Sequence, residues 1–350
     1  MMNASKLKKS FNKFCSTAQI LVFLIIASGC TSDHESLNSF RVGFYNVENL
    51  FDIQDDPQTQ DNDFLPTGAN RWTLERYQAK IEKLASVIIQ MSPQIMGLAE
   101  IENSIVLRDI VESTKNSNHE FGFVHYDSPD YRGIDVGLLY QKNNFEIIKK
   151  NSYSIPKLNT RSILYVKGRI IGWARVIHLF ITHFPSRIGG KGKSEKNRLL
   201  VAKQLRNHMD EILQENLGAE IIVMGDFNDE PQDKSIYDIL NAKDDVINQN
   251  DFLNPAYSMA KEGLGSYMYR GQWDMLDQIL LSSKLADREE LDYVDGSFSI
   301  YSPEWLLQSE GKYKGYPSRT YAGSKYLGGY SDHLPVYLDL RMFATKEASL

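Results

Sequence analysis

Short apolar runs that end or begin at a polar residue recur along this chain. The runs RVGFYN, QIMGLAE, VIHLFITH and EIIVMGDFN each lead into polar side chains, and DQILL and DHLPVYLDL each begin with one. Runs of this length and composition predict buried β-strands. The polar residues at their ends are Asn46, Glu100, His183, Asp226, Asn228, Asp277 and His333.

Two longer segments between these runs have helical periodicity. Residues 73–91 place five apolar side chains on one stripe, and residues 194–213 do the same. Strands outnumber helices along the chain. The pattern therefore predicts an α/β (α+β) fold of mixed, largely antiparallel sheets with helices outside them.

The stretch MGDFND, residues 224–229, allows two interpretations. If it stays extended, Asp226 and Asn228 point to the same side of the strand. Asp and Asn also favour turns, which would make the stretch a simple strand ending. A polar residue at one strand end is usually structural, but six strand ends with this chemistry indicate a site on a rigid scaffold.

The first thirty residues differ from the rest. A cationic KLKK precedes the apolar ILVFLIIA, and the segment ends ASGC at Cys30, in the order of an export signal. ASGC resembles a bacterial lipobox, which implies a lipid on Cys30; a plain signal peptide or an uncleaved anchor are the alternatives. We therefore expect a lipoprotein signal peptide over residues 1–30, a short tether over 31–40 and one domain over 41–345. The protein would be exported and membrane-anchored in the bacterial cell envelope, on its periplasmic or its surface face.

Cysteine content and charge restrict this picture further. The other cysteine, Cys15, lies inside the signal, so the mature chain can form no intrachain disulfide. The signal holds four lysines and no acid, and its removal leaves 35 basic and 45 acidic residues, a formal charge of −10. This charge argues against broad, charge-driven coating of nucleic acid and leaves room for a locally basic groove.

The strand-end motifs together resemble the endonuclease/exonuclease/phosphatase superfamily. The matching pieces span about residues 41–340 and are FYNVENL, GLAEIEN, GIDVGLLY, ITHFPSR, MGDFNDEP, LDQILL and YSDHLPVYLDL. The resemblance implies a four-layer α/β sandwich of two packed sheets with the active site at one rim. The phosphoinositide phosphatases of that superfamily carry a Trp-Cys-Asp-Arg signature, whereas this chain has WDMLDQIL.

The resemblance also implies a metal site and a group that activates water. Glu100 would bind Mg²⁺, with Asn46 and Asp332 beside it, and Mn²⁺ or Ca²⁺ could take its place. Asp226 would orient or deprotonate the attacking water, and Asn228 would hold a phosphate oxygen.

Histidines and cations complete the implied site. His333 would stand against the phosphate as proton donor or transition-state stabiliser, held by Asp277, because imidazole titrates near neutrality. His183 matches the second histidine of the deoxyribonuclease and sphingomyelinase branches. The implied substrate-binding residues are Tyr126, Arg132 and Arg187.

Basic segments near these motifs bear on the substrate. Residues 186–198 and 312–330 are rich in Lys and Arg, and the second also holds tyrosines, which suits phosphates and bases in alternation. The tyrosines could equally cover the edge of the sandwich. We expect an exported Mg²⁺-dependent phosphodiester hydrolase, most simply a nuclease acting on nucleic acid, with no obligate protein partner evident. A phosphomonoesterase or sphingomyelinase-type enzyme on the same scaffold is the first alternative, and a non-catalytic surface binding module the second.

Overall fold

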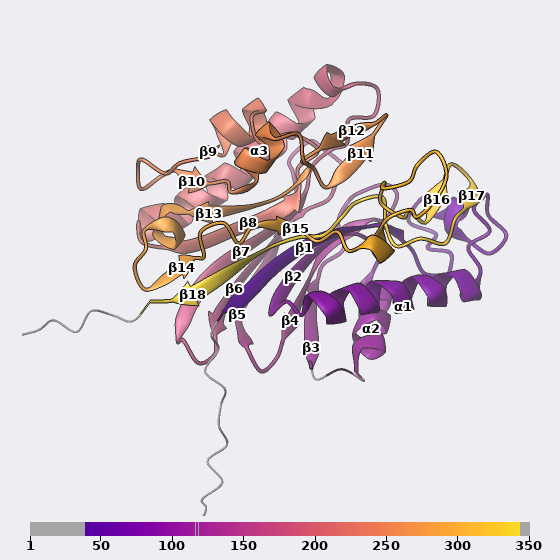
Figure 1. The fold of residues 1–350 in the computed structure, drawn as a ribbon, viewed down its shortest axis with the longest axis horizontal. Helices are drawn as coiled ribbons and strands as arrows, with labels where there is room; N and C mark the ends of the chain where they lie inside the picture. Colours follow the sequence, from indigo (N-terminus) through magenta and orange to yellow (C-terminus); the bar gives the residue numbers. More distant parts are fainter. Residues whose placement is uncertain (1–38, 116, 118, 344–350) are drawn as a thin grey trace, which may run out of the picture. The chain divides into compact units, whose positions relative to one another are not determined.

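The computed structural model describes residues 39–115, 117 and 119–343, in which two seven-stranded sheets pack against each other (Figure 1). Cys30, the expected signal peptide and nearly all of the expected tether lie outside the described residues. None of the helices in the described part is long and apolar enough to cross a bilayer.

The first sheet has the strand order β14-β18-β1-β2-β4-β3, and β15 also pairs with β18. Strands β1 and β2 run parallel, and the other pairs in this sheet are antiparallel. The strands are β1 (Phe40–Leu50), β2 (Ile95–Ile101), β3 (Phe121–His125), β4 (Asp135–Gln141), β14 (Leu291–Tyr293), β15 (Ser299–Ile300) and β18 (Val336–Met342).

The second sheet has the order β5-β6-β7-β8-β13-β10-β9, and its β7–β8 and β9–β10 pairs are parallel. Its strands are β5 (Phe145–Tyr153), β6 (Ile163–Ile170), β7 (Arg175–His183), β8 (Glu220–Asp226), β9 (Ala242–Lys243), β10 (Phe252–Leu253) and β13 (Asp277–Ser282). Two small hairpins complete the β-structure: β11 (Tyr267–Tyr269) with β12 (Gln272–Asp274), and β16 (Tyr321–Ala322) with β17 (Lys325–Tyr326).

Helices cover the outer faces of both sheets and make the four layers (Figure 1). Helices α1 (Leu74–Met91) and α2 (Ser104–Thr114) pack on the first sheet, and α3 (Lys191–Glu215) packs on the second. The four-layer sandwich of mixed, largely antiparallel sheets is confirmed. The predicted helices over residues 73–91 and 194–213 appear as α1 and α3.

Short helices occupy the connections. Helix α4 spans Ala256–Lys261, 3₁₀ turns span Asn62–Phe64, Ser283–Ala286 and Glu304–Leu306, and a π-helical turn spans Ser235–Ile239. Helix α2 was not predicted, although its start has a clear signal. The side chain of Asn103 accepts hydrogen bonds from the backbone N–H groups of Ile105 and Val106, as an N-cap does.

The apolar core between the sheets contains every second residue of the central strands, since strand side chains alternate between faces. The sheets approach closely where β2 faces β8: a Cβ added to Gly97 would meet Met224 Sδ at 2.7 Å. At one end of the core, the next residue on the inward face of each of four strands is polar instead of apolar. These polar side chains are Asn46 on β1, His183 on β7, Asp226 on β8 and Asp277 on β13.

A C-terminal loop, residues 307–332, packs on the side of α1. The ammonium of Lys80, which is 2% exposed, donates to Thr320 Oγ1 and to the carbonyl of Tyr330. The buried carboxylate of Glu48 accepts the backbone N–H groups of Thr320 and Tyr321. A helix in the first third of the chain thereby fixes the segment that leads into Asp332 and His333.

Three of the five tyrosines of this loop are structural, whereas Tyr313 is 49% exposed. Tyr321, Tyr326 and Tyr330 pack into the apolar cluster under α1, where Tyr321 contacts Trp72 and Tyr330 contacts Trp305. Of the two interpretations of these aromatic residues, the structure therefore supports the one in which they cover the sandwich edge.

Replacing Lys80 with Met should lower the free energy of unfolding by about 3 kcal/mol, because Glu48 would stay buried without its nearest cation. Urea denaturation measures this change. Lys325→Met, at an exposed lysine of the same loop, is the control and should shift stability by less than about 0.5 kcal/mol. Equal stabilities of the two variants would contradict the anchoring role of Lys80.

Candidate functional site

A cavity of about 580 Å³ opens where the polar residues continue the inter-sheet core. Side chains from both sheets and from the β11–β12 hairpin line it. The predicted residues among them are Glu100, Arg132, His183, Arg187, Asp226, Asn228, Asp332 and His333. Asn46 and Asp277 lie just behind this lining, in contact with it.

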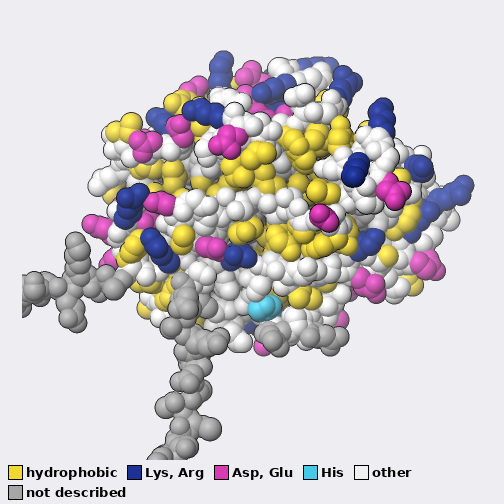
Figure 2. All heavy atoms as spheres, in the orientation of Figure 1, with side chains coloured by type: hydrophobic (Ala, Val, Ile, Leu, Met, Phe, Trp, Pro, Cys, Tyr) yellow, Lys and Arg dark blue, Asp and Glu magenta, His cyan; other side chains and the backbone are white. Residues whose placement is uncertain are grey.

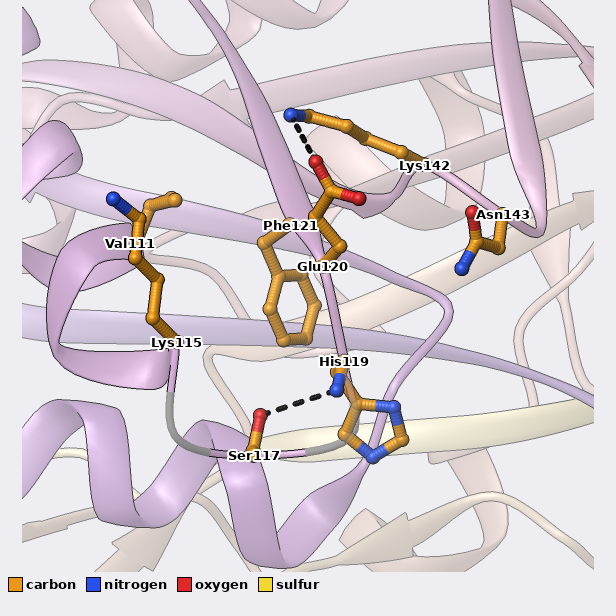
Figure 3. Close-up of a pocket in the computed structure, with 8 residues that line it drawn as sticks. All are labelled: Val111, Lys115, Ser117, His119, Glu120, Phe121, Lys142 and Asn143. Atoms are coloured by element: carbon orange, nitrogen blue, oxygen red, sulfur yellow. Dashed lines mark hydrogen bonds and ion pairs between the residues drawn. The ribbon is translucent and has the colours of Figure 1, made fainter.

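A different hollow, of about 250 Å³, lies at the far end of β3 and is lined by none of the predicted site residues. Figure 3 shows its side chains, among them the ion pair between Lys142 and Glu120 at 2.7 Å. Neither of the two groups of described residues that could hold a metal lies in this depression.

Strand register creates the central feature of the site. On adjacent strands, His183 pairs with Asp226 and Asp226 pairs with Asp277. All three side chains are buried. Like charges on directly opposite strand positions repel, and burial increases the cost. Burial raises the pKa of Asp226 to about 7, and a cation close to both carboxylates favours their ionised forms.

His333 provides that cation. It precedes β18 and bonds through its backbone to Tyr267, whose ring centroid lies 4.7 Å from the imidazole. Its Nδ1 donates to Asp277 Oδ2 at 2.6 Å, and its Nε2 lies 3.9 Å from Asp226 Oδ2. Burial opposes the charge, but the two aspartates outweigh it and raise the pKa of His333 well above its usual value. His333 is an imidazolium at neutral pH.

His183 has the opposite state. Its Nε2 lies 3.4 Å from Asp226 Oδ2, and its ring is almost fully buried. Burial, then the nearby cations Arg161, Arg132 and His333, lower the pKa of His183 well below its usual value. The two imidazoles beside Asp226 therefore differ by one proton at neutral pH.

The MGDFND stretch forms both a turn and part of the site. The strand ends at Asp226, and Asn228 has a left-handed backbone with φ of 49°, so the stretch does not stay extended and the turn interpretation describes its backbone. Asp226 Oδ1 accepts the N–H of Asn228 at 2.9 Å, which is an Asx turn. The amide of Asn228 donates to the carbonyl of Phe184 at 3.0 Å, and both Asp226 and Asn228 still line the cavity.

Glu100 reaches the cavity through a break in its strand. Strand alternation would send it to the α1 side with Met96 and Leu98, but β2 has an irregularity between Ala99 and Ile101 and φ of 64° at Glu100. Such a bulge re-aims a side chain. The Glu100 carboxylate accepts the N–H of Asn49 at 2.7 Å and the amide of Asn46 at 3.3 Å.

Asn46 also donates to Asp226 Oδ2 at 3.0 Å, so its amide joins the two carboxylates of Glu100 and Asp226. Its own oxygen accepts the N–H of Glu48. Asp332 also lines the cavity, and its carboxylate forms an ion pair with Arg319 at 2.5 Å.

The predicted substrate-binding residues have different surroundings. Arg132 projects into the cavity, with its Nε 3.4 Å from Asp130. Arg187 also lines the cavity, but it donates to the carbonyl of Asn228 and pairs with Asp274 at 3.4 Å. Tyr126 does not line the cavity; its ring lies outside it, near Lys150.

The described residues contain two groups whose carboxylate and imidazole atoms lie close enough to share a metal: Asp226, Asp277 and His333, and the separate His125, Asp127 and Asp135. In the first group the imidazolium of His333 already lies against both carboxylates and offsets one of their two charges. Among the described residues that line the cavity, Glu100 is the carboxylate without a paired cation within salt-bridge distance, whereas Asp332 is paired with Arg319. Carboxylate oxygens with open space beside them suit a hard divalent cation that keeps several waters.

Sequence reasoning missed three supports of the site. The buried hydroxyl of Ser266 donates to the Asp277 oxygen that His333 also contacts, and Tyr267 packs over the His333 ring. Arg161 is a buried cation behind His183. Arg161 directly precedes the run SILYV, so the logic that selected polar strand ends would have found it; Ser266 carries no comparable signal.

Comparisons with known proteins agree with this fold. A family model described as the endonuclease/exonuclease/phosphatase family matches residues 41–342. A Bacteroides thetaiotaomicron protein of that family is 15% identical with a TM-score of 0.56, over 86% of this chain and 97% of that one. No curated protein matches the sequence.

Two further solved structures share the fold. The B. thetaiotaomicron mannosyl-6-phosphatase Bt3783 is 14% identical with a TM-score of 0.55, over 86% of this chain and 99% of that one. The human Nocturnin catalytic domain, with a bound sulfate, is 15% identical with a TM-score of 0.52, over 87% of this chain and 95% of that one.

Asp277→Asn should lower the pKa of His333, because burial then acts without the charge that now outweighs it. A proton NMR titration of the histidine rings measures the shift. His178, which bonds to Tyr165 on the outer side of β7, serves as an internal reference and should titrate unchanged. An unshifted His333 titration would contradict its assignment as the counter-ion of Asp277.

Proposed function

We propose that this chain, which belongs to the endonuclease/exonuclease/phosphatase family, hydrolyses phosphodiesters with the help of Mg²⁺ and acts as a nuclease. Membership makes it a metal-dependent phosphoric ester hydrolase. What we propose beyond membership is that the substrate is a phosphodiester, that the metal is Mg²⁺ and that the natural substrate is nucleic acid. One observation carries it: a protonated and a neutral imidazole face one carboxylate in a single cavity.

The protonation states suit attack by water on a phosphate. Asp226 orients the water and accepts its proton, assisted by the neutral His183 at 3.4 Å. His333, held as an imidazolium by Asp277, stabilises the phosphate charge and donates a proton to the leaving oxygen. The leaving group of a phosphodiester is a poorly leaving alkoxide. Its departure therefore depends strongly on the proton that His333 donates.

Cations and amides of the cavity hold the phosphate. Arg132 extends into the cavity from the loop before β4 and would neutralise non-bridging oxygens. Asn228 lies beside Asp226 at the same wall. Together they place the phosphorus atom against the water that Asp226 holds, which supplies the orientation that in-line attack needs.

The oxygen donors of the cavity fit a divalent cation. Glu100 would hold it, with Asn46 and Asp332 as further oxygen donors. When bound, the cation would neutralise phosphate charge and polarise the P–O bond. Asn46 bridges Glu100 and Asp226, so it couples the metal-binding carboxylate to the water-orienting one.

A substrate panel tests the proposal directly. The purified soluble domain, with Mg²⁺ or EDTA, is offered plasmid DNA, RNA, bis-p-nitrophenyl phosphate, phosphomonoesters that include inositol and sugar phosphates, and sphingomyelin. We expect cleavage of nucleic acid and of the chromogenic diester that EDTA abolishes. Turnover of monoesters or sphingomyelin alone would favour the first alternative, and no turnover would favour a binding module.

Glu100→Gln should reduce turnover by at least about a hundredfold with the fold intact, because it removes the main charge for the cation. A Mg²⁺ titration of activity, with circular dichroism for the fold, measures this. The matched control is Glu146→Gln, an exposed strand carboxylate paired with Arg169. Wild-type activity of Glu100→Gln at low Mg²⁺ would show that another group binds the metal.

Basic residues outside the cavity test the polymeric substrate. Lys312, Lys314 and Lys325 are exposed on the C-terminal loop, whereas Arg319 is bound to Asp332. Figure 2 shows Lys and Arg interspersed with Asp and Glu on one face, so long-range attraction there is weak. Neutralising the three lysines should weaken cleavage of long strands and flatten its salt dependence, by up to about 0.9 slope units for each phosphate that the loop no longer binds.

Cleavage of the small chromogenic diester should be unchanged in the triple-lysine variant, since it reaches only the cavity. Unchanged cleavage of long strands as well would remove this loop from the substrate path and favour a small phosphate ester.

The proposal extends to location. The N-terminal segment supports export and a lipid on Cys30, both of which lie outside the described residues. Cys30→Ser should then move the protein out of the membrane fraction or stall its maturation. Fractionation with palmitate labelling measures this; a variant that fractionates and labels like wild type would rule out the lipobox.

A further inference from the structure

Arg161 joins segments that are far apart in the sequence and that carry site residues. It precedes β6, is 5% exposed, and does not line the cavity. Its Nη1 donates to Asp130 Oδ2 at 3.1 Å, and its Nη2 donates to the carbonyl of Phe184 at 2.5 Å. A buried arginine that makes two such bonds orders the backbone and side chains around it.

The bond to Asp130 reaches the phosphate-binding arginine. The other oxygen of the Asp130 carboxylate accepts the N–H of Arg132 at 3.0 Å and lies 3.4 Å from Arg132 Nε. Asp130 is itself 4% exposed. One buried carboxylate therefore connects Arg161, behind the cavity, to Arg132, which projects into it.

The bond to Phe184 reaches the segment that carries His183. The Phe184 carbonyl also accepts the side-chain amide of Asn228 at 3.0 Å. The Phe184 N–H donates to the carbonyl of Asp226 at 2.8 Å, and the residue directly follows His183. Arg161 thus fixes the backbone at which His183, Asp226 and Asn228 meet.

We propose that Arg161 is a positioning residue: through Asp130 and Phe184 it holds Arg132, Asn228 and His183 in place for a phosphate that it does not touch. The proposal rests on the proposed function of the cavity. The charged groups that face His183 are Asp226 on β8, His333 before β18, Arg132 before β4 and Arg161 before β6. Arg161 adds to the positive field that keeps His183 neutral.

Two substitutions separate geometry from charge. Arg161→Lys keeps the positive charge but lacks the planar fork that donates to Asp130 and to Phe184 at the same time, so KM should rise about tenfold. The pH at which kcat/KM falls on the acid side of its profile (the acid limb) should stay unchanged. Arg161→Gln also removes the cation. The pKa of His183 then rises, and the acid limb should move to higher pH because His183 is protonated at a higher pH.

Binding of inorganic phosphate in the presence of Mg²⁺, measured by calorimetry, tests the positioning without turnover. Arg161→Lys should weaken phosphate binding about tenfold in the wild-type background and by a smaller factor in an Arg132→Ala background, because only the route through Phe184 to Asn228 then remains. If the protein binds phosphate in this way but cleaves no diester, the proposed function fails and the role of Arg161 stands.

Arg41→Lys is the matched control. Arg41 makes a two-point bond to Asp339 between β1 and β18, and its replacement should leave phosphate affinity unchanged. If Arg161→Lys does not fold, the double variant Arg161→Gln with Asp130→Asn removes both buried charges together and should show the same loss of phosphate affinity. Equal losses in both Arg132 backgrounds, or wild-type affinity and pH profile in the Arg161 variants, would overturn the proposal.

Discussion

Two carboxylates, Asp226 and Asp277, are buried side by side on paired strands, and the organisation of the site follows from this constraint. Unbalanced, this pair would cost several kcal/mol. His333 offsets the cost by lying against both. Ser266 donates to Asp277, and Tyr267 holds the ring from the other side.

The position of His333 depends in turn on packing far from the cavity. Lys80 on α1 holds the loop that leads into His333 by donating a hydrogen bond to the carbonyl of Tyr330. The two residues are 250 positions apart in the sequence. The buried Glu48 holds the same loop through two backbone N–H groups. Burial raises the pKa of Glu48 to about 7 and lowers the pKa of Lys80 to about 8. Keeping both groups charged in the interior therefore lowers the free energy of unfolding. The stability of this corner and the charge state of the site are therefore linked.

Much of the site could be predicted because strand alternation is regular. On each central strand, the next residue on the apolar face is polar, so the alternation alone places four side chains together. These are Asn46, His183, Asp226 and Asp277. Glu100 violates the pattern, since only a bulge with a positive φ turns it into the cavity, and its assignment came from resemblance. Ser266 acts through contacts between segments distant in sequence, which no local pattern encodes. Arg161 stands at a strand end as the predicted residues do, but its partners Asp130 and Phe184 come from other segments.

The charges of the cavity also narrow the chemistry. Each cationic side chain that lines the cavity is paired with an aspartate, so little unpaired positive charge faces a substrate there. These cations are Arg132, Arg187, Lys191 and His333. One phosphate group matches that arrangement. Positive charges that bind a longer polyanion would have to come from exposed lysines outside the cavity. The residues that carry out the reaction and the residues that select a polymeric substrate would therefore be different residues.

In the proposed mechanism, water attacks phosphorus directly and neither histidine forms a bond to it. The stereochemical course of hydrolysis tests this most directly, with a phosphodiester made chiral at phosphorus by sulfur substitution and cleaved in ¹⁸O-labelled water. A single in-line displacement by water, oriented by Asp226, predicts inversion of configuration at phosphorus. Retention would indicate a covalent phosphoryl-enzyme intermediate and would contradict the roles assigned to Asp226, His183 and His333.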